Sequence, residues 1–252
     1  MLTIWSFVIV CPLIFLAGLV DAIGGGGGLI SLPAYIFAGL PAHMAVATNK
    51  MSSACGTSVV TARMIKNKLI DLRLAVPSII MAVLGSSIGA RLSLLIPEEL
   101  FLKIMVVILP ICAFLVLNRK IFNDDGAKEI EVNIKTYVLA GTCAFVIGMY
   151  DGLYGPGTGT FLIIAFTIFA KINMQVANGQ AKIINLTTNI TSLVIFLLNG
   201  QVLIPLGIAA AISNMIGGYI GAGLAIKNGS RIIRPCIILV LTLLLIKIVF
   251  KL

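Results

Sequence analysis

Two long stretches of the sequence carry almost no charge. From Met1 to Asn49 the one charged side chain is Asp21, and from Ile183 to Ile226 there is none. Charged residues make up 11% of the chain, whereas a typical soluble domain has about 25%. Because a membrane-spanning helix needs about 20 mainly apolar residues, the sequence predicts an all-α integral membrane protein that crosses the bilayer several times.

The apolar segments form two sets of five, separated by one long polar connection. They lie at about 3–22, 29–40, 43–64, 72–94 and 99–117, and then at about 136–150, 159–171, 174–198, 202–226 and 231–250. We therefore predict a first membrane repeat at 1–117, a cytoplasmic linker loop at 118–135 and a second membrane repeat at 136–252. The segments 29–40 and 159–171 are too short for a full span, so the total is about eight to ten membrane segments.

The two sets resemble each other in sequence. Three stretches match in order: GLVDAIGGGGG (18–28) with GMYDGLYGPGTG (148–159), AVATNKM (45–51) with ANGQAKI (177–183), and GSSIGARL (85–92) with GGYIGAGL (217–224). These matches pair Asp21 with Asp151 and Lys50 with Lys182. Such self-similarity predicts that the chain is an internal duplication.

The distribution of basic residues predicts that the two halves are inverted. Arg63, Lys66, Lys68 and Arg73 crowd the connection after the third segment, which places that connection in the cytoplasm. Its counterpart at 198–203 carries no charge, so we expect it outside. Opposite orientations of two similar halves are the inverted-repeat design of many secondary transporters.

Each half has a glycine-rich stretch where we expect the helix to break. These stretches are Gly24–Gly28 and residues 154–160. Non-helical backbone is tolerated in a membrane only inside protein or beside an aqueous cavity. A short helix would start after each break, and its N-terminal N–H groups attract anions. The alternative interpretation is that the glycines serve only close helix packing.

Two lysines are predicted to lie near the middle of the membrane. Lys50 is about eight residues from the start of its segment, or roughly 12 Å deep at about 1.5 Å per residue, and Lys182 has the same position in the second half. A buried lysine needs a partner, a watery cavity or a substrate. Pairing with Asp21 and Asp151 and contact with a substrate both remain open.

Polar residues gather near these lysines and complete the candidate site. Lys182, Asn185 and Asn189 are three and four residues apart, so they share one helix face. Hydrogen bonding between helices is the alternative role for any single hydroxyl there. The candidate substrate-binding residues are Gly25, Gly26, Gly27, Gly28, Asn49, Lys50, Ser53, Gly155, Gly157, Thr158, Gly159, Lys182, Asn185 and Asn189. The candidate coupling or charge-pairing residues are Asp21 and Asp151.

The chain resembles the TauE/SafE family, whose members are called sulfite exporters. The resemblance lies in the glycine run after the first segment, its echo in the second half, and the A-x-x-T-x-K pattern at 45–50. It extends over nearly the whole chain. The resemblance implies a secondary transporter of sulfur-containing anions such as sulfite, sulfonates or thiosulfate. It also implies that Gly24–Gly28 and Gly155–Gly159 flank the substrate path.

The expected function is therefore alternating-access transport of a small sulfur-containing anion across the inner membrane of the cell. The expected partners are the anion, the lipid bilayer and protons as a candidate coupling ion, with no nucleic acid. We expect no cofactor, no metal and no catalytic residue, because the sequence holds no nucleotide-binding loop and no hydrolase motif. The alternatives are a transporter or channel for another small anion or for a cation, and an intramembrane enzyme.

Overall fold

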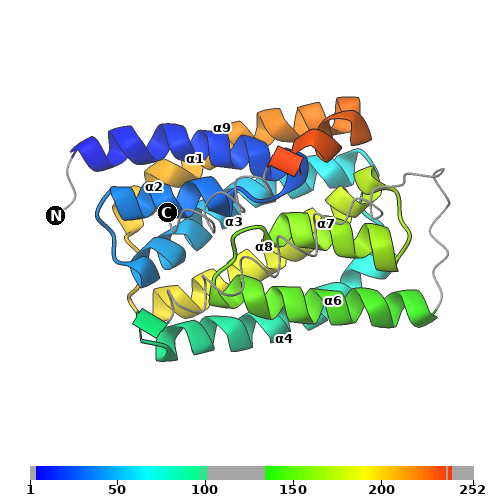
Figure 1. The fold of residues 1–252 in the computed structure, drawn as a ribbon, viewed down its shortest axis with the longest axis horizontal. Coiled ribbons are helices and arrows are strands. Elements are labelled where there is room, and N and C mark those ends of the chain that lie inside the picture. The colour runs from blue at the N-terminus through cyan, green and yellow to red at the C-terminus, as the bar shows by residue number, and fades with distance from the viewer. Residues whose placement is uncertain (1–3, 98, 101–133, 237, 240–252) are drawn as a thin grey trace.

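The computed structural model describes residues 4–97, 99–100, 134–236 and 238–239, and their regular structure is helical throughout. The helices are α1 (Ile4–Gly24), α2 (Gly28–Phe37), α3 (Ala42–Lys66), α4 (Leu72–Leu95), α6 (Ile134–Leu153), α7 (Thr158–Phe169), α8 (Met174–Leu198) and α9 (Ile204–Asn228). Figure 1 shows them as one elongated bundle of roughly aligned helices. The predicted all-α fold class is confirmed.

The helix boundaries follow the apolar segments closely. α4 and α8 begin and end within a residue of the predicted segments at 72–94 and 174–198. The predicted segment at 99–117 and the linker at 118–135 lie almost wholly outside the described residues, as does the end of the segment at 231–250. The limits of the two predicted repeats therefore stay predictions.

Several helices have the length and the surface of membrane spans. Among the described residues, five helices are long and apolar enough to cross a bilayer, namely α1, α4, α6, α8 and α9. α9 exposes Ile204, Ile208, Ile212 and Ile216, each about half accessible, along one face with a spacing of four residues. A continuous apolar stripe on the outside is unfavourable against water and favourable against the hydrocarbon of a bilayer. The chain is therefore a multi-pass membrane protein.

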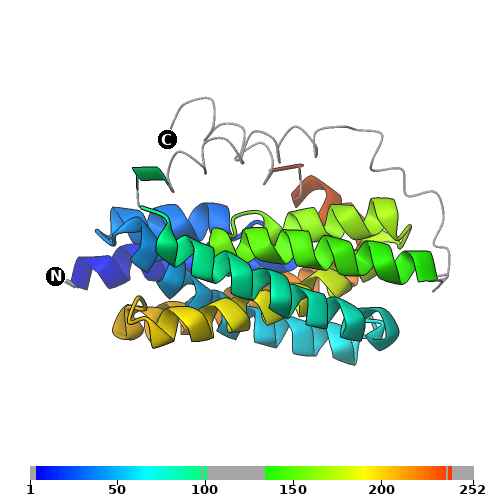
Figure 2. The same ribbon diagram turned by 90° about the horizontal axis from the view of Figure 1, so that it is seen from below.

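The helices pack as two bundles, and each bundle contains one long helix from the other half of the sequence. α9 packs against α1 and α3, whereas α4 packs against α6 and α8. The short helices α2 and α7 lie against α1 and α6, respectively. We call α1, α2, α3 and α9 the first bundle, and α4, α6, α7 and α8 the second bundle. Figures 1 and 2 both show α4 beside α6.

Equivalent glycines bring equivalent helices together in the two bundles. A Cβ atom added at any of these glycines would overlap a backbone carbonyl of the neighbouring helix, so only glycine permits the approach. The contacts are Gly85–Phe145 and Gly89–Met149 between α4 and α6, and Gly217–Phe15 and Gly221–Leu19 between α9 and α1. Both pairs of helices are therefore parallel, and the halves repeat the same packing.

The direction of the helices agrees with the relation that an inverted repeat requires. In Figure 1, α1 starts at the left beside the N-terminus, whereas the colour of α4 runs from cyan at the right to green at the left. Since α6 is parallel to α4, α6 runs opposite to α1, its counterpart in the other half. The inverted repeat and the membrane side that each end meets stay an interpretation.

Candidate functional site

Both glycine-rich stretches interrupt the helical path, as predicted. α1 ends at Gly24 and α2 begins at Gly28, and between them Gly25 and Gly26 have φ angles of 77° and 82°. In the second half, α6 and α7 are separated by a turn in which Gly155 has a φ of 96°. Glycine adopts such positive φ angles without the steric penalty of a Cβ atom. These residues therefore leave the helix to form the predicted breaks.

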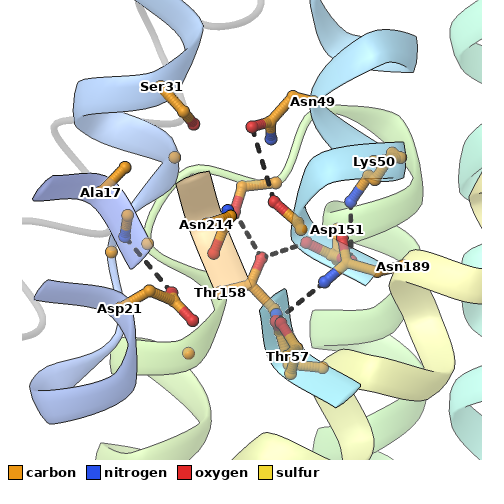
Figure 3. A pocket seen from close by; sticks show the side chains of 18 residues that line it. Ala17, Asp21, Ser31, Asn49, Lys50, Thr57, Asp151, Thr158, Asn189 and Asn214 are labelled. Carbon is orange, nitrogen blue, oxygen red and sulfur yellow. Dashed lines mark hydrogen bonds and ion pairs between the residues drawn. The ribbon is translucent and has the colours of Figure 1, made fainter. Parts of the chain in front are cut away.

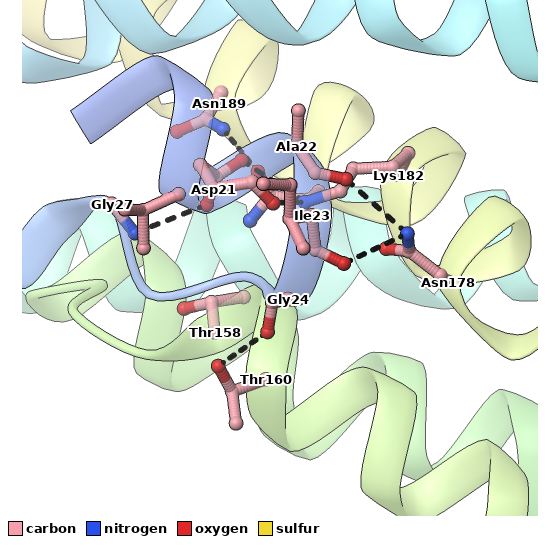
Figure 4. A network of polar contacts seen from close by, with 12 residues as sticks. Asp21, Ala22, Ile23, Gly24, Gly27, Thr158, Thr160, Asn178, Lys182 and Asn189 are labelled. Atoms are coloured by element: carbon pink, nitrogen blue, oxygen red, sulfur yellow. Dashed lines mark hydrogen bonds and ion pairs between the residues drawn. The ribbon is translucent and has the colours of Figure 1, made fainter. Parts of the chain in front are cut away.

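The two breaks touch each other. Thr160 at the start of α7 donates a hydrogen bond from Oγ1 to the carbonyl oxygen of Gly24, over 2.8 Å (Figure 4). A Cβ atom on Gly28 would lie 2.9 Å from the Cα atom of Pro156, and one on Gly25 would overlap the backbone nitrogen of Thr160. The backbones of the two halves can meet this closely only because glycine occupies these positions.

Lys50 of α3 forms a buried ion pair with Asp151 of α6. The Lys50 Nζ atom lies 2.7 Å from Asp151 Oδ2, and each side chain is 2% exposed. Thr158 at the start of α7 donates from Oγ1 to the other carboxylate oxygen of Asp151, also over 2.7 Å. The carboxylate is therefore held by an ammonium group from the first bundle and a hydroxyl from the second bundle.

Lys182 of α8 forms the corresponding ion pair with Asp21 of α1. Its Nζ atom lies 3.1 Å from Asp21 Oδ2 and also donates to the carbonyl oxygen of Asp21. The N–H of Gly27 donates to Asp21 Oδ1 over 3.3 Å. The Lys182 side chain is fully buried, whereas that of Asp21 is 22% exposed. Each lysine thus pairs with the aspartate of the other half.

The Asn178 side chain caps the C-terminal end of α1 beside this ion pair. Its side-chain nitrogen donates to the carbonyl oxygens of Ala22 and Ile23, over 3.2 Å and 3.1 Å (Figure 4). The last carbonyls of a helix have no intrahelical partner. The α8 amide therefore satisfies acceptors that the break in α1 leaves open.

A polar pocket lies where the breaks and the charged residues meet (Figure 3). It encloses about 430 Å³ of space, including space open to solvent. Its lining residues are Ala17, Asp21, Gly26, Gly27, Gly28, Ser31, Asn49, Lys50, Ser53, Thr57, Asp151, Gly155, Gly157, Thr158, Gly159, Asn185, Asn189 and Asn214. The pocket draws on α1, α2, α3, α6, α7, α8 and α9.

The structure brings nearly all of the predicted site residues to this pocket. Gly25 and Lys182 are the two that do not line it. Gly25 packs against α7, and Lys182 is fully buried and paired with Asp21, whose side chain does line the pocket. A direct role of either residue in substrate binding stays a prediction.

The sequence analysis did not select four of the lining residues. They are Ala17, Ser31, Thr57 and Asn214. Ser31 is 2% exposed, and its hydroxyl has no hydrogen-bond partner among the described residues. Asn214 lies beside Ser213 in the largely apolar middle of α9. A polar side chain inside an apolar membrane helix is the signal by which both residues could have been found.

The remaining polar groups of the pocket are neutral amides and hydroxyls. Asn189 donates from Nδ2 to Oδ1 of Asn185 over 2.9 Å, and Ser53 donates from Oγ to the side-chain oxygen Oδ1 of Asn49 over 3.5 Å. In the part of the chain that the structure describes, no three or more His, Cys, Asp or Glu side chains gather as metal ligands do. With two ammonium and two carboxylate groups paired, the site is neutral overall and rich in hydrogen-bonding groups.

Comparisons with known proteins agree with this architecture. Residues 10–248 match the protein family described as Sulfite exporter TauE/SafE. The chain is 32% identical over 226 residues to the probable membrane transporter protein YfcA of Escherichia coli (strain K12), which covers 89% of this chain and 82% of that protein. A probable membrane transporter protein of Haemophilus influenzae is 31% identical over 238 residues, covering 94% of this chain and 91% of that protein.

More distant relatives carry similar descriptions. The probable membrane transporter protein YunE of Bacillus subtilis (strain 168) is 26% identical over 263 aligned positions, covering 95% of this chain and 96% of that protein. A comparison with solved structures gives no match. The family match spans nearly the whole sequence, and the described helices include five of membrane-spanning length. The chain belongs to the sulfite exporter TauE/SafE family of membrane transporters.

Proposed function

We propose that the protein is a secondary transporter of a small sulfur-containing anion, such as sulfite or a sulfonate, in the inner membrane. The observation that carries the proposal is the polar pocket at the meeting point of two broken helices. Secondary transporters bind their substrates at such breaks, where helix N-termini face anionic groups. The family description supplies the sulfur-containing class of substrate.

The charges around the pocket favour a monovalent anion. Lys50 and Lys182 are each paired with a carboxylate, so the four charged groups sum to zero. An anion in the pocket is then stabilised by the start of α2, by the start of α7 and by neutral hydrogen-bond donors. A helix N-terminus corresponds to roughly half an elementary charge. Two such ends balance about one negative charge, and a dianion would leave one uncompensated.

The same charges argue against the rival function of cation transport. Asp21 and Asp151 are the two carboxylates of the pocket, and each is already bonded to an ammonium group. A cation would have to displace a lysine whose side chain is 2% exposed or less. Transport of another small anion remains the closer alternative, and the substrate panel below separates it from the proposal.

The test is counterflow in proteoliposomes that contain the purified protein. Vesicles are loaded with unlabelled sulfite, and the uptake of labelled sulfite is followed against protein-free vesicles. Methanesulfonate, thiosulfate, sulfate, acetate and chloride are then added outside as competitors. We expect sulfite and methanesulfonate to compete strongly and acetate and chloride weakly. Uptake equal to that of protein-free vesicles, or competition by acetate and chloride alone, would contradict the proposal.

A further inference from the structure

The residues that line the pocket differ between the two halves of the chain. Gly18 of α1 lies against Asn214 of α9, and Gly148 of α6 lies against Ala82 of α4 in the same way. Asn214 and Ala82 are 132 positions apart, the offset that also relates Lys50 to Lys182. Asn214 therefore occupies the position that Ala82 has in the other half, yet Asn214 lines the pocket and Ala82 does not.

The residues that surround these two positions also differ between the bundles. A Cβ atom added to Gly18 would lie 2.6 Å from the side-chain oxygen of Asn214, and one added to Gly56 would overlap that oxygen. The position equivalent to Gly56 in the second half is Thr188, which carries a side chain beside the smaller Ala82. The first bundle thus leaves room for one amide, and the second bundle fills the corresponding space.

Two other polar lining residues break the symmetry in the same direction. Asn49 of α3 corresponds to Ala181 of α8, at the offset of 132. Ser31 of α2 corresponds to an apolar residue of α7 at any offset between 130 and 132, since residues 161–163 are Phe, Leu and Ile. None of these apolar counterparts lines the pocket. These three asymmetric polar groups belong to the first bundle, whereas the second bundle contributes one, the Thr158 hydroxyl, which corresponds to a glycine at 26–28 and is bonded to Asp151.

We infer that Ser31, Asn49 and Asn214 form one hydrogen-bonding subsite that binds the oxygen atoms of the transported anion and sets its selectivity. The inference rests on the proposed function and adds the residues that recognise the substrate. In Figure 3, Ser31 and Asn49 lie at the top of the pocket, Asn214 lies near its centre, and Lys50 and Asp151 lie at the right.

The unpartnered hydroxyl of Ser31 is the strongest single indication of a ligand. A buried polar group without a hydrogen bond is costly, so native structures rarely keep one without a reason. Ser31 lies in the first turn of α2, at the positive end of the helix dipole. The backbone N–H groups of residues 29–31 donate to the carbonyl oxygens of Gly26 and Gly27, so the Ser31 hydroxyl is the open donor there. An anion oxygen placed at this point accepts from the hydroxyl and is favoured by the helix dipole.

The test compares three alanine variants, Ser31→Ala, Asn49→Ala and Asn214→Ala, in the counterflow assay with methanesulfonate and sulfite. Ser31→Ala removes an oxygen that has no hydrogen-bond partner among the described residues, so the thermal stability of the variant without ligand is expected to be unchanged. Its KM for methanesulfonate is expected to rise about ten-fold or more, as for the loss of a hydrogen bond to a charged group. Methanesulfonate is also expected to raise the melting temperature less than in the wild type.

Ser213→Ala is the matched control for the α9 variant. Ser213 is the neighbour of Asn214, does not line the pocket, and donates its hydroxyl hydrogen bond to Ala209 of its own helix. We expect it to keep the wild-type KM and ligand-induced stabilisation. A variant that fails to fold is set aside, because Ser31→Ala decides the question by itself.

The outcomes separate the inference from the proposed function. If the wild type transports sulfite and Ser31→Ala keeps the wild-type KM, ligand stabilisation and competitor ranking, the subsite is wrong and the transport function stands. If the wild type transports none of the sulfur anions, both fail. If the KM and the competitor ranking change in Ser31→Ala while its unliganded stability does not, the subsite is supported.

Discussion

The ion pair between Lys50 and Asp151 offers a sharp test of how the two bundles are held together. The change is Asp151→Asn, which keeps the shape of the side chain and removes its charge. The Asn oxygen can still accept the hydrogen bond from Thr158. The variant therefore isolates the loss of the charge that compensates the buried Lys50 ammonium group.

The structure sets the expected magnitude. At 2.7 Å, two unit charges attract by about 6 kcal/mol with an effective dielectric constant of about 20. Desolvation offsets part of this energy in the native pair, but the variant leaves Lys50 buried and unpaired. Breaking one partner of a buried ion pair costs about 3–5 kcal/mol. We expect a loss of that size in the free energy of unfolding.

Asp21→Asn serves as the comparison. Asp21 is 22% exposed, against 2% for Asp151, so water screens its pair with Lys182. Lys182 also keeps its bond to the backbone carbonyl of residue 21 in this variant. The cost is therefore expected to be about 1–2 kcal/mol, near that of an ordinary hydrogen bond. The two variants should differ clearly although their substitutions are the same.

Unfolding in mixed detergent micelles measures both variants, and a cycle with Lys50→Met isolates the pair. We expect the double variant Lys50→Met with Asp151→Asn to lose less free energy of unfolding than the two single variants lose in sum, because no unpaired charge remains. The reasoning is refuted if Asp151→Asn costs no more than Asp21→Asn, or if the Lys50 and Asp151 losses simply add.

Two further predictions follow from the breaks and from the charge balance. Gly25→Ala should prevent the folded protein from accumulating, because the added Cβ atom overlaps the Thr160 backbone. Gly39 also has a positive φ but lies in open space, so Gly39→Ala should lower the free energy of unfolding by only about 1–2 kcal/mol. The yield of monodisperse protein in gel filtration compares the two variants, and equal yields would contradict the overlap. Sulfite counterflow should fall as the pH rises through neutrality, because the sulfite dianion replaces the monoanion. Methanesulfonate keeps one negative charge over this range, so its counterflow should not fall. A parallel fall of both rates would rule out selection by substrate charge.

Much of the fold could be predicted because charged residues and glycine runs are energetically unfavourable inside a membrane helix and therefore stand out in an apolar sequence. The helix limits follow from apolar runs, and the breaks at Gly25 and Gly155 follow from glycines that a continuous helix would not favour. Lys50 and Asp151 were selected because charges inside a bilayer need a reason. In each case the energetic penalty is visible in the sequence without knowledge of the packing.

The side chains that complete the pocket could not be predicted in the same way. Ser31 and Asn214 are polar residues in largely apolar helices, which makes them visible in the sequence, but hydrogen bonding to a neighbouring helix explains that signal equally well. Their exposure to the pocket depends on how α2 and α9 pack, and no sequence pattern gives that rotation. The same uncertainty explains Lys182, which was expected to line the pocket but is buried in its pair with Asp21.

The crossed ion pairs constrain how the proposed alternating access can work. Lys50 and Asp21 belong to the first bundle, and their partners Asp151 and Lys182 belong to the second bundle. Both pairs therefore bridge the surface along which the bundles would rock. Separating a buried pair without replacement costs several kcal/mol, more than an ordinary substrate contact returns. We expect the bundles to pivot about these pairs, so that access changes at the ends of the pocket while its charged centre stays intact.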